Sequence, residues 1–267
     1  MKTYSKLILV LCLPLLLVTL SGCLKTNAQD KDLLEQVKEK QEINWGVKND
    51  TELFGLMNIK TREVEGFDID IAKEITKRLL GEEGQANFIE VTSKTSIPLL
   101  KNGNIDAIIA TMTISDERKK QVDFSDIYFA AGQSLLVPKD SNIKKVSDLG
   151  SENTVLAVKG STSAENIRVH AKDANILELE NYAEAFTALQ SGQGDAMTTD
   201  NSILLGMSEE NPNFILAGDN FTNEPYGIAI DKGQDSFVLE VNQALKEMKE
   251  DDTYAVIYKK WFKEEPK

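Results

Sequence analysis

The chain contains an internal repeat in which a helix end, a glycine and a strand beginning with Asp-Ala follow in the same order. The segment 100–107 (LKNGNIDA) is echoed 89 residues later by the segment 189–196 (LQSGQGDA). In both copies the glycine is typical of a helix C-cap, a helical stretch comes before it and a polar turn comes after the strand. The repeat predicts two lobes built on the same plan.

Alternating strand-like and helix-like segments place each lobe in the α/β class. The order β-α-β-α-β in the first lobe predicts a mainly parallel sheet flanked by helices. Asp68 is expected to cap the first long helix, whose apolar residues fall at helical spacing until Gly81 ends it. The other elements expected in this lobe are strands at 43–47, 88–91 and 105–110 and a helix at 94–101.

The second lobe repeats this order, and the chain then returns to the first. The segments of the second lobe and the return are strands at 155–158, 176–179, 196–199 and 226–230 and helices at 162–170, 182–190, 200–207, around 238–248 and at 253–262. We therefore expect lobe one to comprise 41–128 plus 228–267, lobe two 134–221, and a two-strand hinge 129–133 and 222–227.

The N-terminal segment carries the pattern of a bacterial lipoprotein signal. Lys2 and Lys6 precede an apolar run of about 14 residues, which ends at Leu20-Ser21-Gly22-Cys23. Such a run is shorter than the roughly 20 residues of a membrane span and is typical of a secretory signal. We expect a signal peptide at 1–22, lipid on Cys23, and a tether at 23–40 that holds the protein on the extracytoplasmic face of the cell membrane. An ordinary signal peptide with an incidental cysteine is the alternative.

Composition argues against several classes of protein. The formal net charge is −13, and since residues 1–22 hold two lysines and no acid, the rest of the chain carries −15, which disfavours nucleic acid as a partner. Cys12 leaves with the signal and Cys23 is taken by lipid, so no disulfide is expected. With His170 the only histidine, we expect no structural zinc, no cofactor, and a solvated His170 rather than a catalytic triad.

Candidate binding residues follow the repeated strand of each lobe, because ligands of open α/β sheets lie beyond the carboxyl ends of the strands. In the first lobe Thr111 and Thr113 offer hydroxyl groups, and Ser115 caps a short helix carrying Arg118. The planar guanidinium of an arginine suits a carboxylate. A solvated or structurally paired surface arginine is the alternative.

The second lobe offers two further positions. Asp200 either caps the next helix or faces an ammonium group. Ser161 and Thr162 follow Gly160 at a helix start, where free backbone N–H groups bind an anion or are simply capped. Donors on one side and Asp200 on the other match the opposite charges of an α-amino acid.

The series of motifs from about Trp45 to the C-terminus resembles the bacterial extracellular solute-binding proteins, family 3, the polar amino acid receptors of ABC importers. It is most similar to the glutamine- and glutamate-type lipoproteins. The motifs are Gly66-Phe67-Asp68-Ile69-Asp70, Met112-Thr113-Ile114-Ser115-Asp116-Glu117-Arg118, Asp123-Phe124-Ser125-Asp126, Pro225-Tyr226-Gly227-Ile228-Ala229 and Ile257-Tyr258-Lys259-Lys260-Trp261-Phe262.

The resemblance implies a two-lobed periplasmic-binding-protein-like fold (type 2) and a role for each candidate. Arg118 and Thr113 would hold the α-carboxylate together with Thr162 and the helix start at Ser161, and Asp200 would hold the α-amino group. Of the remaining candidates, Phe67 would wall the ligand, and Tyr226 would touch the ligand or the hinge.

The side-chain end of the ligand is less defined. Gly46-Val47-Lys48-Asn49-Asp50 resembles aspartate and glutamate receptors, in which the lysine reaches the ligand. Those receptors usually add an arginine at the place held here by Ser96, which favours glutamine first and glutamate second. Lys48 either hydrogen-bonds an amide oxygen or is solvated.

The resulting expectation is a monomeric receptor that closes on a free amino acid and delivers it to the permease and ATPase of an ABC importer. Two alternatives remain open. A cyclohexadienyl dehydratase-like enzyme on the same fold would need a general acid, for which Glu52 or Glu224 are the candidates. A surface adhesin would need an exposed apolar patch.

Overall fold

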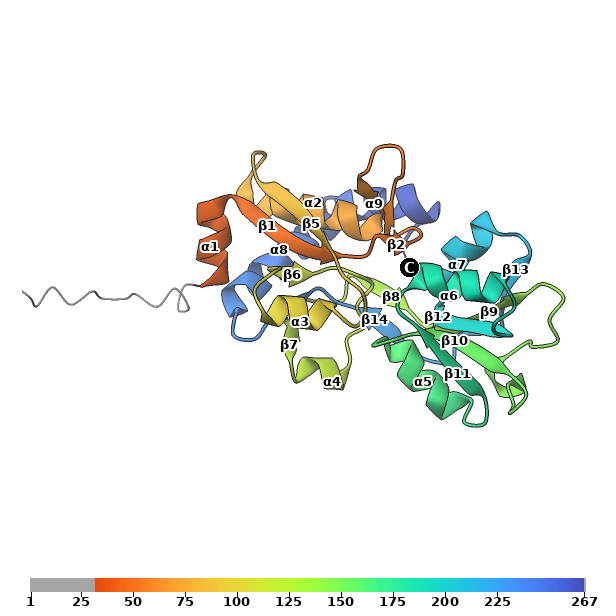
Figure 1. Ribbon diagram of the computed structural model, residues 1–267. Coiled ribbons are helices and arrows are strands. Elements are labelled where there is room, and N and C mark those ends of the chain that lie inside the picture. Colours follow the sequence, from red (N-terminus) through yellow and green to blue (C-terminus); the bar gives the residue numbers. More distant parts are fainter. Residues whose placement is uncertain (1–31, 267) are drawn as a thin grey trace, which may run out of the picture. The chain divides into compact units, whose positions relative to one another are not determined.

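The computed structural model describes residues 32–266, and both the predicted signal peptide and the predicted lipidation site, Cys23, lie outside them (Figure 1). Within the predicted tether, the residues Leu33–Lys40 form helix α1. Its buried Val37 joins the main hydrophobic core, and the helix contacts α8. Within residues 32–266, no helix has the length and apolar character needed to cross a membrane.

The first large sheet has the strand order β5-β1-β6-β15-β7. Its strands β1 and β5 pair in parallel, as do β1 and β6, whereas β15 pairs antiparallel with both β6 and β7. The bounds are β1 Glu42–Val47, β5 Gln85–Glu90, β6 Ala107–Ile108, β7 Val122–Phe124 and β15 Ala229–Asp231. We call this sheet and its helices the first lobe.

The second large sheet repeats the plan with the order β11-β10-β12-β9-β13. Strand β10 pairs in parallel with β11 and β12, and β9 pairs antiparallel with β12 and β13. The bounds are β9 Gln133–Pro138, β10 Thr154–Val158, β11 Asn175–Leu179, β12 Ala196–Asp200 and β13 Phe214–Ala217. This sheet and its helices form the second lobe.

Helices cover both faces of each sheet, which agrees with the consecutive buried residues of strands such as β10 and β12. In β10, Val155 packs in one core cluster with Ile167 of α5, while its neighbour Leu156 packs in another with residues of α6 and α7. The first lobe has α2 Phe67–Leu80, α3 Ser96–Lys101, α4 Asp116–Lys119, α8 Asp235–Glu250 and α9 Thr253–Phe262, and the second has the 3-10 turn Val146–Asp148, α5 Thr162–His170, α6 Tyr182–Gln190 and α7 Asn201–Glu210.

Two small sheets complete the fold. Strands β8 (Phe129–Ala131) and β14 (Glu224–Tyr226) pair antiparallel where the chain passes from the first lobe to the second and back. Strands β2 (Asp50–Thr51), β3 (Gly55–Met57) and β4 (Val64–Glu65) form a small sheet in the first lobe. The lobe and hinge boundaries inferred from the sequence stay predictions.

Several details of the predicted elements differ from the structure. Four of the five strands in each large sheet run in the same direction, so the prediction of mainly parallel sheets is confirmed; the exceptions are β15 and β9, which enter from the crossing segments and run against their neighbours. The strand expected at 226–230 is two strands, β14 and β15, which belong to different sheets. Asp68 does not cap α2, since Gly66 occupies the cap position; the predicted end at Gly81 is confirmed.

Candidate functional site

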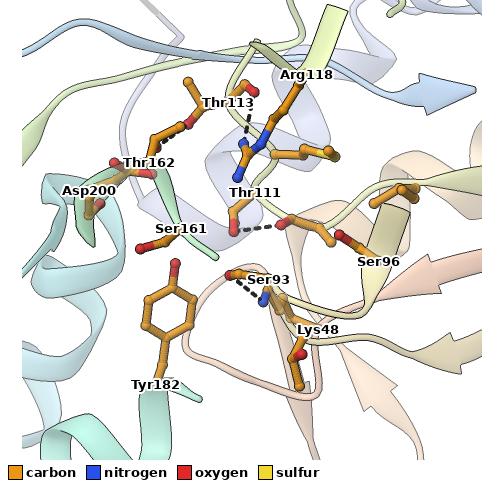
Figure 2. Close-up of a pocket in the computed structure, with 15 residues that line it drawn as sticks. Lys48, Ser93, Ser96, Thr111, Thr113, Arg118, Ser161, Thr162, Tyr182 and Asp200 are labelled. Carbon is orange, nitrogen blue, oxygen red and sulfur yellow. Dashed lines mark hydrogen bonds between the residues drawn. The ribbon is translucent and has the colours of Figure 1, made fainter. Parts of the chain in front are cut away.

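A pocket of about 350 Å³ of empty volume lies between the carboxyl ends of the two large sheets (Figure 2). The residues that line it come from both lobes: Lys48, Thr92, Ser93, Ser96, Ile108, Ala110, Thr111, Met112, Thr113, Arg118, Ser161, Thr162, Ser163, Tyr182 and Asp200.

Arg118 lies at the pocket on the short helix α4, which Ser115 caps by accepting a hydrogen bond from the Arg118 backbone N–H. Its guanidinium donates to the carbonyl of Thr113 at 2.9 Å and to that of Gly160 in the other lobe at 3.3 Å. Burial lowers the pKa of Arg118. In the described part of the chain no carboxylate forms an ion pair with it, so this cation is suited to an incoming anion.

Thr111 and Thr113 lie beside Arg118 after strand β6. Thr111 has a left-handed backbone (φ 50°), and its N–H donates to the buried carboxylate of Asp68 at 2.9 Å. The hydroxyl of Tyr128 donates to the other oxygen of Asp68, also at 2.9 Å. Asp68 therefore fixes the backbone of a pocket residue instead of capping its own helix.

Asp200 faces the pocket from the second lobe, at the end of β12. It occupies the N-cap position of α7 without making a side-chain capping bond, so the capping alternative is wrong. Its Oδ2 accepts a hydrogen bond from the Tyr226 hydroxyl at 2.6 Å, and its buried Oδ1 has no partner among the described residues. The pKa of Asp200 is raised to about 7: burial and, to a lesser extent, the charge of Glu224 raise it, while the hydrogen bond from Tyr226 and the charge of Arg118 lower it.

The start of helix α5 forms the wall between Arg118 and Asp200. Ser161 caps this helix by accepting from the N–H of Ala164 at 3.2 Å, so the capping interpretation of this residue is confirmed. Thr162 Oγ1 lies 2.9 Å from Glu224 Oε2 and 3.4 Å from Thr113 Oγ1 of the first lobe. Gly160 has φ 75°, and a Cβ there would lie 2.9 Å from Cα of Lys94, so the two lobes meet closely at this turn.

The opposite end of the pocket is formed by Lys48 and hydroxyl groups (Figure 2). Lys48 Nζ donates to Ser93 Oγ at 3.0 Å and lies 5.2 Å from the centre of the Tyr182 ring. Burial lowers the pKa of Lys48 to about 8, although the nearby charge of Asp50 raises it. Lys48 is buried, so the alternative of a solvated lysine is wrong. Ser96 also lines this end.

Two candidate residues lie behind the pocket rather than in it. Phe67 is fully buried in an aromatic cluster with Phe54, Tyr128 and Phe129, so the prediction that it walls the ligand is wrong. The physical reason is its position at the start of α2, on the side that packs against the core. Tyr226 is also fully buried; its hydroxyl donates to Asp200, and its backbone forms an antiparallel bridge with Thr113.

The model of the bacterial extracellular solute-binding proteins, family 3, matches residues 43–264, which include the sheets and the pocket described above. This chain belongs to that family.

Two curated relatives and one solved structure illustrate the similarity. The family 3 chain is 58% identical over 271 residues to the ABC transporter glutamine-binding protein GlnH of Bacillus subtilis (strain 168), covering 100% of this chain and 99% of the relative. It is 54% identical over 243 residues to a glutamine-binding protein of Geobacillus stearothermophilus, covering 85% and 93%. An ancestral arginine-binding protein bound to glutamine superposes with TM-score 0.79 at 40% identity, covering 84% of this chain and 99% of that one.

Some pocket residues of this family 3 protein were not singled out from the sequence, chiefly Tyr182 and Ser93. Tyr182 begins α6 just after β11, and Ser93 follows β5. Both residues follow the carboxyl end of a parallel strand, which is the same position that indicated Thr113 and Asp200 as binding residues. Applying the rule to every parallel strand, rather than to the repeated strand alone, would have found them.

Proposed function

We propose that this protein captures a free α-amino acid between its lobes and delivers it to an ABC importer. The observation that carries the proposal is the pairing of Arg118 and Asp200. They approach one pocket from different lobes. Among the described residues, the Arg118 guanidinium forms no ion pair and the buried Oδ1 of Asp200 has no hydrogen-bond partner. An amino acid zwitterion would satisfy both, with its carboxylate at Arg118 and Thr113 and its ammonium at Asp200.

We propose glutamine as the first ligand and glutamate as the second. Support comes from the two relatives named as glutamine-binding proteins and from the similar structure that holds glutamine. At the far end of the pocket Lys48 and the hydroxyls of Ser93 and Ser96 offer donors for an amide oxygen. Glutamate would use the charge of Lys48, but Ser96 stands where receptors for acidic ligands usually have an arginine.

Capture would proceed by closure of the two lobes about β8 and β14. The contacts of Thr162 with Thr113 and of Arg118 with Gly160 join the lobes across the pocket, as expected of a closed form. Ligand contacts from both lobes favour that form over an open one. The closed monomer would then dock on the permease and ATPase complex, held at the extracytoplasmic face by lipid on Cys23.

No specific observation favours either alternative, the dehydratase-like enzyme or the surface adhesin. The carboxylate of Glu224 is occupied by Thr162 and Asn166, and neither Glu224 nor Glu52 is among the residues that line the pocket. Both curated relatives carry the names of binding proteins. We therefore propose a binding protein rather than an enzyme or an adhesin.

A thermal-shift screen against the common amino acids tests this function. A ligand at 100 times its Kd stabilises a fold by about 2.7 kcal/mol. We expect the largest shift with glutamine, confirmed by calorimetric titration at one ligand per chain. Absence of a shift with glutamine, glutamate, aspartate, asparagine, histidine, arginine and cystine would overturn the proposal, and product formation from arogenate or prephenate would favour the enzyme.

A further inference from the structure

The segment 50–53 of the first lobe rests on the second lobe at the rim of the pocket. Asp50, in strand β2, accepts hydrogen bonds on Oδ2 from the backbone N–H groups of Tyr182 at 2.8 Å and Ala183 at 3.4 Å. These are the first two residues of α6. The first N–H groups of a helix have no partner within the helix, and its N-terminus favours a negative charge.

Helix α6 already has a cap from its own lobe. Asn181 accepts from the N–H of Glu184 at 2.8 Å. Asp50 therefore adds a second cap, supplied by the opposite lobe, to N–H groups that Asn181 leaves free. We call the contact of Asp50 with Tyr182 and Ala183 the interlobe cap.

A second contact of the same segment supports the docking. Glu52 and Leu53 lie over Gly206 in α7, where an added Cβ would be 2.7 Å from Glu52 Cβ and 3.2 Å from Leu53 Cγ. The glycine thus permits a close approach that a larger residue would obstruct. Two helices of the second lobe meet one short segment of the first.

We propose that Asp50 is a positioning residue that holds the lobes closed on the ligand through the interlobe cap. Asp50 is not among the pocket-lining residues; it acts through Tyr182, whose side chain is one of them. The carboxylate can interact with this helix N-terminus only while the lobes are together, so the favourable free energy of the cap belongs to the closed form alone. The inference rests on the proposed function, capture by closure.

The test is the release rate of glutamine from the Asp50→Asn variant, measured by stopped-flow fluorescence. Asparagine can still accept one hydrogen bond, but it loses the charge at the helix end. Release should be about five- to thirty-fold faster, with the association rate nearly unchanged, because the cap forms only after the ligand has entered. An unchanged release rate overturns the inference.

The matched control is Asn181→Ala, which removes the cap that belongs to the same lobe. This variant should lower the melting temperature of the protein, yet its release rate should stay within about twofold of wild type. Gly206→Ala should accelerate release as Asp50→Asn does, because its methyl group obstructs Glu52. If Asn181→Ala and Asp50→Asn accelerate release equally, the effect belongs to helix stability, and the inference fails.

Asp50 also lies near Lys48, so its substitution could change release through the charge of Lys48 instead of through the interlobe cap. A second experiment separates these two effects. Asp50→Asn should accelerate release by the same factor in a Lys48→Met background; disappearance of the effect there assigns it to Lys48 and overturns the inference. If the wild type binds no amino acid, the proposed function fails. X-ray scattering of the ligand-free protein then tests the interlobe cap independently of any ligand. A larger radius of gyration for Asp50→Asn then supports the cap, and an equal radius refutes it.

Discussion

The hydroxyl of Tyr226 donates to Oδ2 of Asp200 at 2.6 Å and leaves Oδ1 of the same carboxylate without a partner among residues 32–266. Tyr226 lies in β14, one of the two strands between the lobes, whereas Asp200 ends β12 of the second lobe. The tyrosine therefore holds the carboxylate in place while the other oxygen stays available to a ligand. A residue behind the pocket thus orients an acceptor within it.

Tyr226→Phe should weaken glutamine binding by about ten- to a hundred-fold. A hydrogen bond to a charged group contributes about 1.5–3 kcal/mol, and its loss also raises the pKa of Asp200, which leaves less of the ionised acceptor. Calorimetric titration at pH 8 measures the first effect apart from the second. Tyr254→Phe is the control, since its hydroxyl donates to the carbonyl of Tyr128 within the aromatic cluster. Equal affinities for wild type and Tyr226→Phe would refute the orienting role.

The ligand-free fold should become less stable as the pH rises from about 4 to about 7. Burial raises the pKa of both Asp68 and Asp200 to about 7, above the value near 3.9 of an unfolded chain. The folded state therefore binds more protons than the unfolded state in this window, and its stability falls as those protons leave. Thermal melts without ligand at steps of pH measure this slope, which Asp200→Asn should reduce.

Glutamine affinity should change in the opposite direction over the same window. An ammonium group requires the ionised form of Asp200, so affinity should rise with pH and level off above about 7. Titrations from pH 5 to pH 8 measure it, and Asp200→Asn should bind weakly with little dependence on pH. A flat profile for the wild type would show that Asp200 does not face the ammonium.

The binding residues that directly follow a repeated strand could be predicted, because their place in the fold is determined by their position in the sequence relative to that strand. The repeat marks where a strand ends in each lobe, and parallel strands bring their carboxyl ends to one edge, so Thr113, Arg118 and Asp200 were found without a structure. The choice between capping and binding for Asp200 could not be made, because an N-cap position and a pocket position have the same sequence signature. Only the absence of a capping bond separates them.

Other features depend on the path of the chain through space. Phe67 begins a helix, a position that fits either a pocket wall or a core residue, and its packing against Phe54 and Phe129 makes it a core residue. The apolar run 226–230 has no polar break, so its division between two sheets is invisible in the sequence. The direction of β9 and β15 follows from the crossings between the lobes, which periodicity does not encode.

Arg118→Lys should lower glutamine affinity by about a hundred-fold or more while the protein folds normally. A lysine cannot form two parallel hydrogen bonds with a carboxylate, and it also loses the bonds to the carbonyls of Thr113 and Gly160. Titration and thermal melting measure the two quantities. Arg168→Lys is the matched control, because Arg168 pairs with Glu178 on the exposed side of α5. Retained affinity in Arg118→Lys would refute the carboxylate contact.

Lys48→Met should raise the stability of the ligand-free fold and weaken selectivity for glutamine. Burial lowers the pKa of Lys48 to about 8, below its unfolded value near 10.4, so below pH 8 the buried ammonium destabilises the fold by on the order of 3 kcal/mol. Methionine fills a similar space without that charge. The melting temperature at pH 7 should therefore rise, and the gain should vanish as the pH approaches 10.

The same variant identifies the end of the pocket that recognises the ligand side chain. Glutamine should lose about tenfold in affinity, because its amide oxygen loses a charged donor, whereas methionine, which has no amide, should lose little. Competition titrations with both amino acids measure the ratio. Lys73→Met serves as the control, since Lys73 lies exposed on α2 near the Phe88 ring. Selectivity equal to that of the wild type would place the side chain away from Lys48, because a donor that the amide does not use cannot distinguish the two ligands.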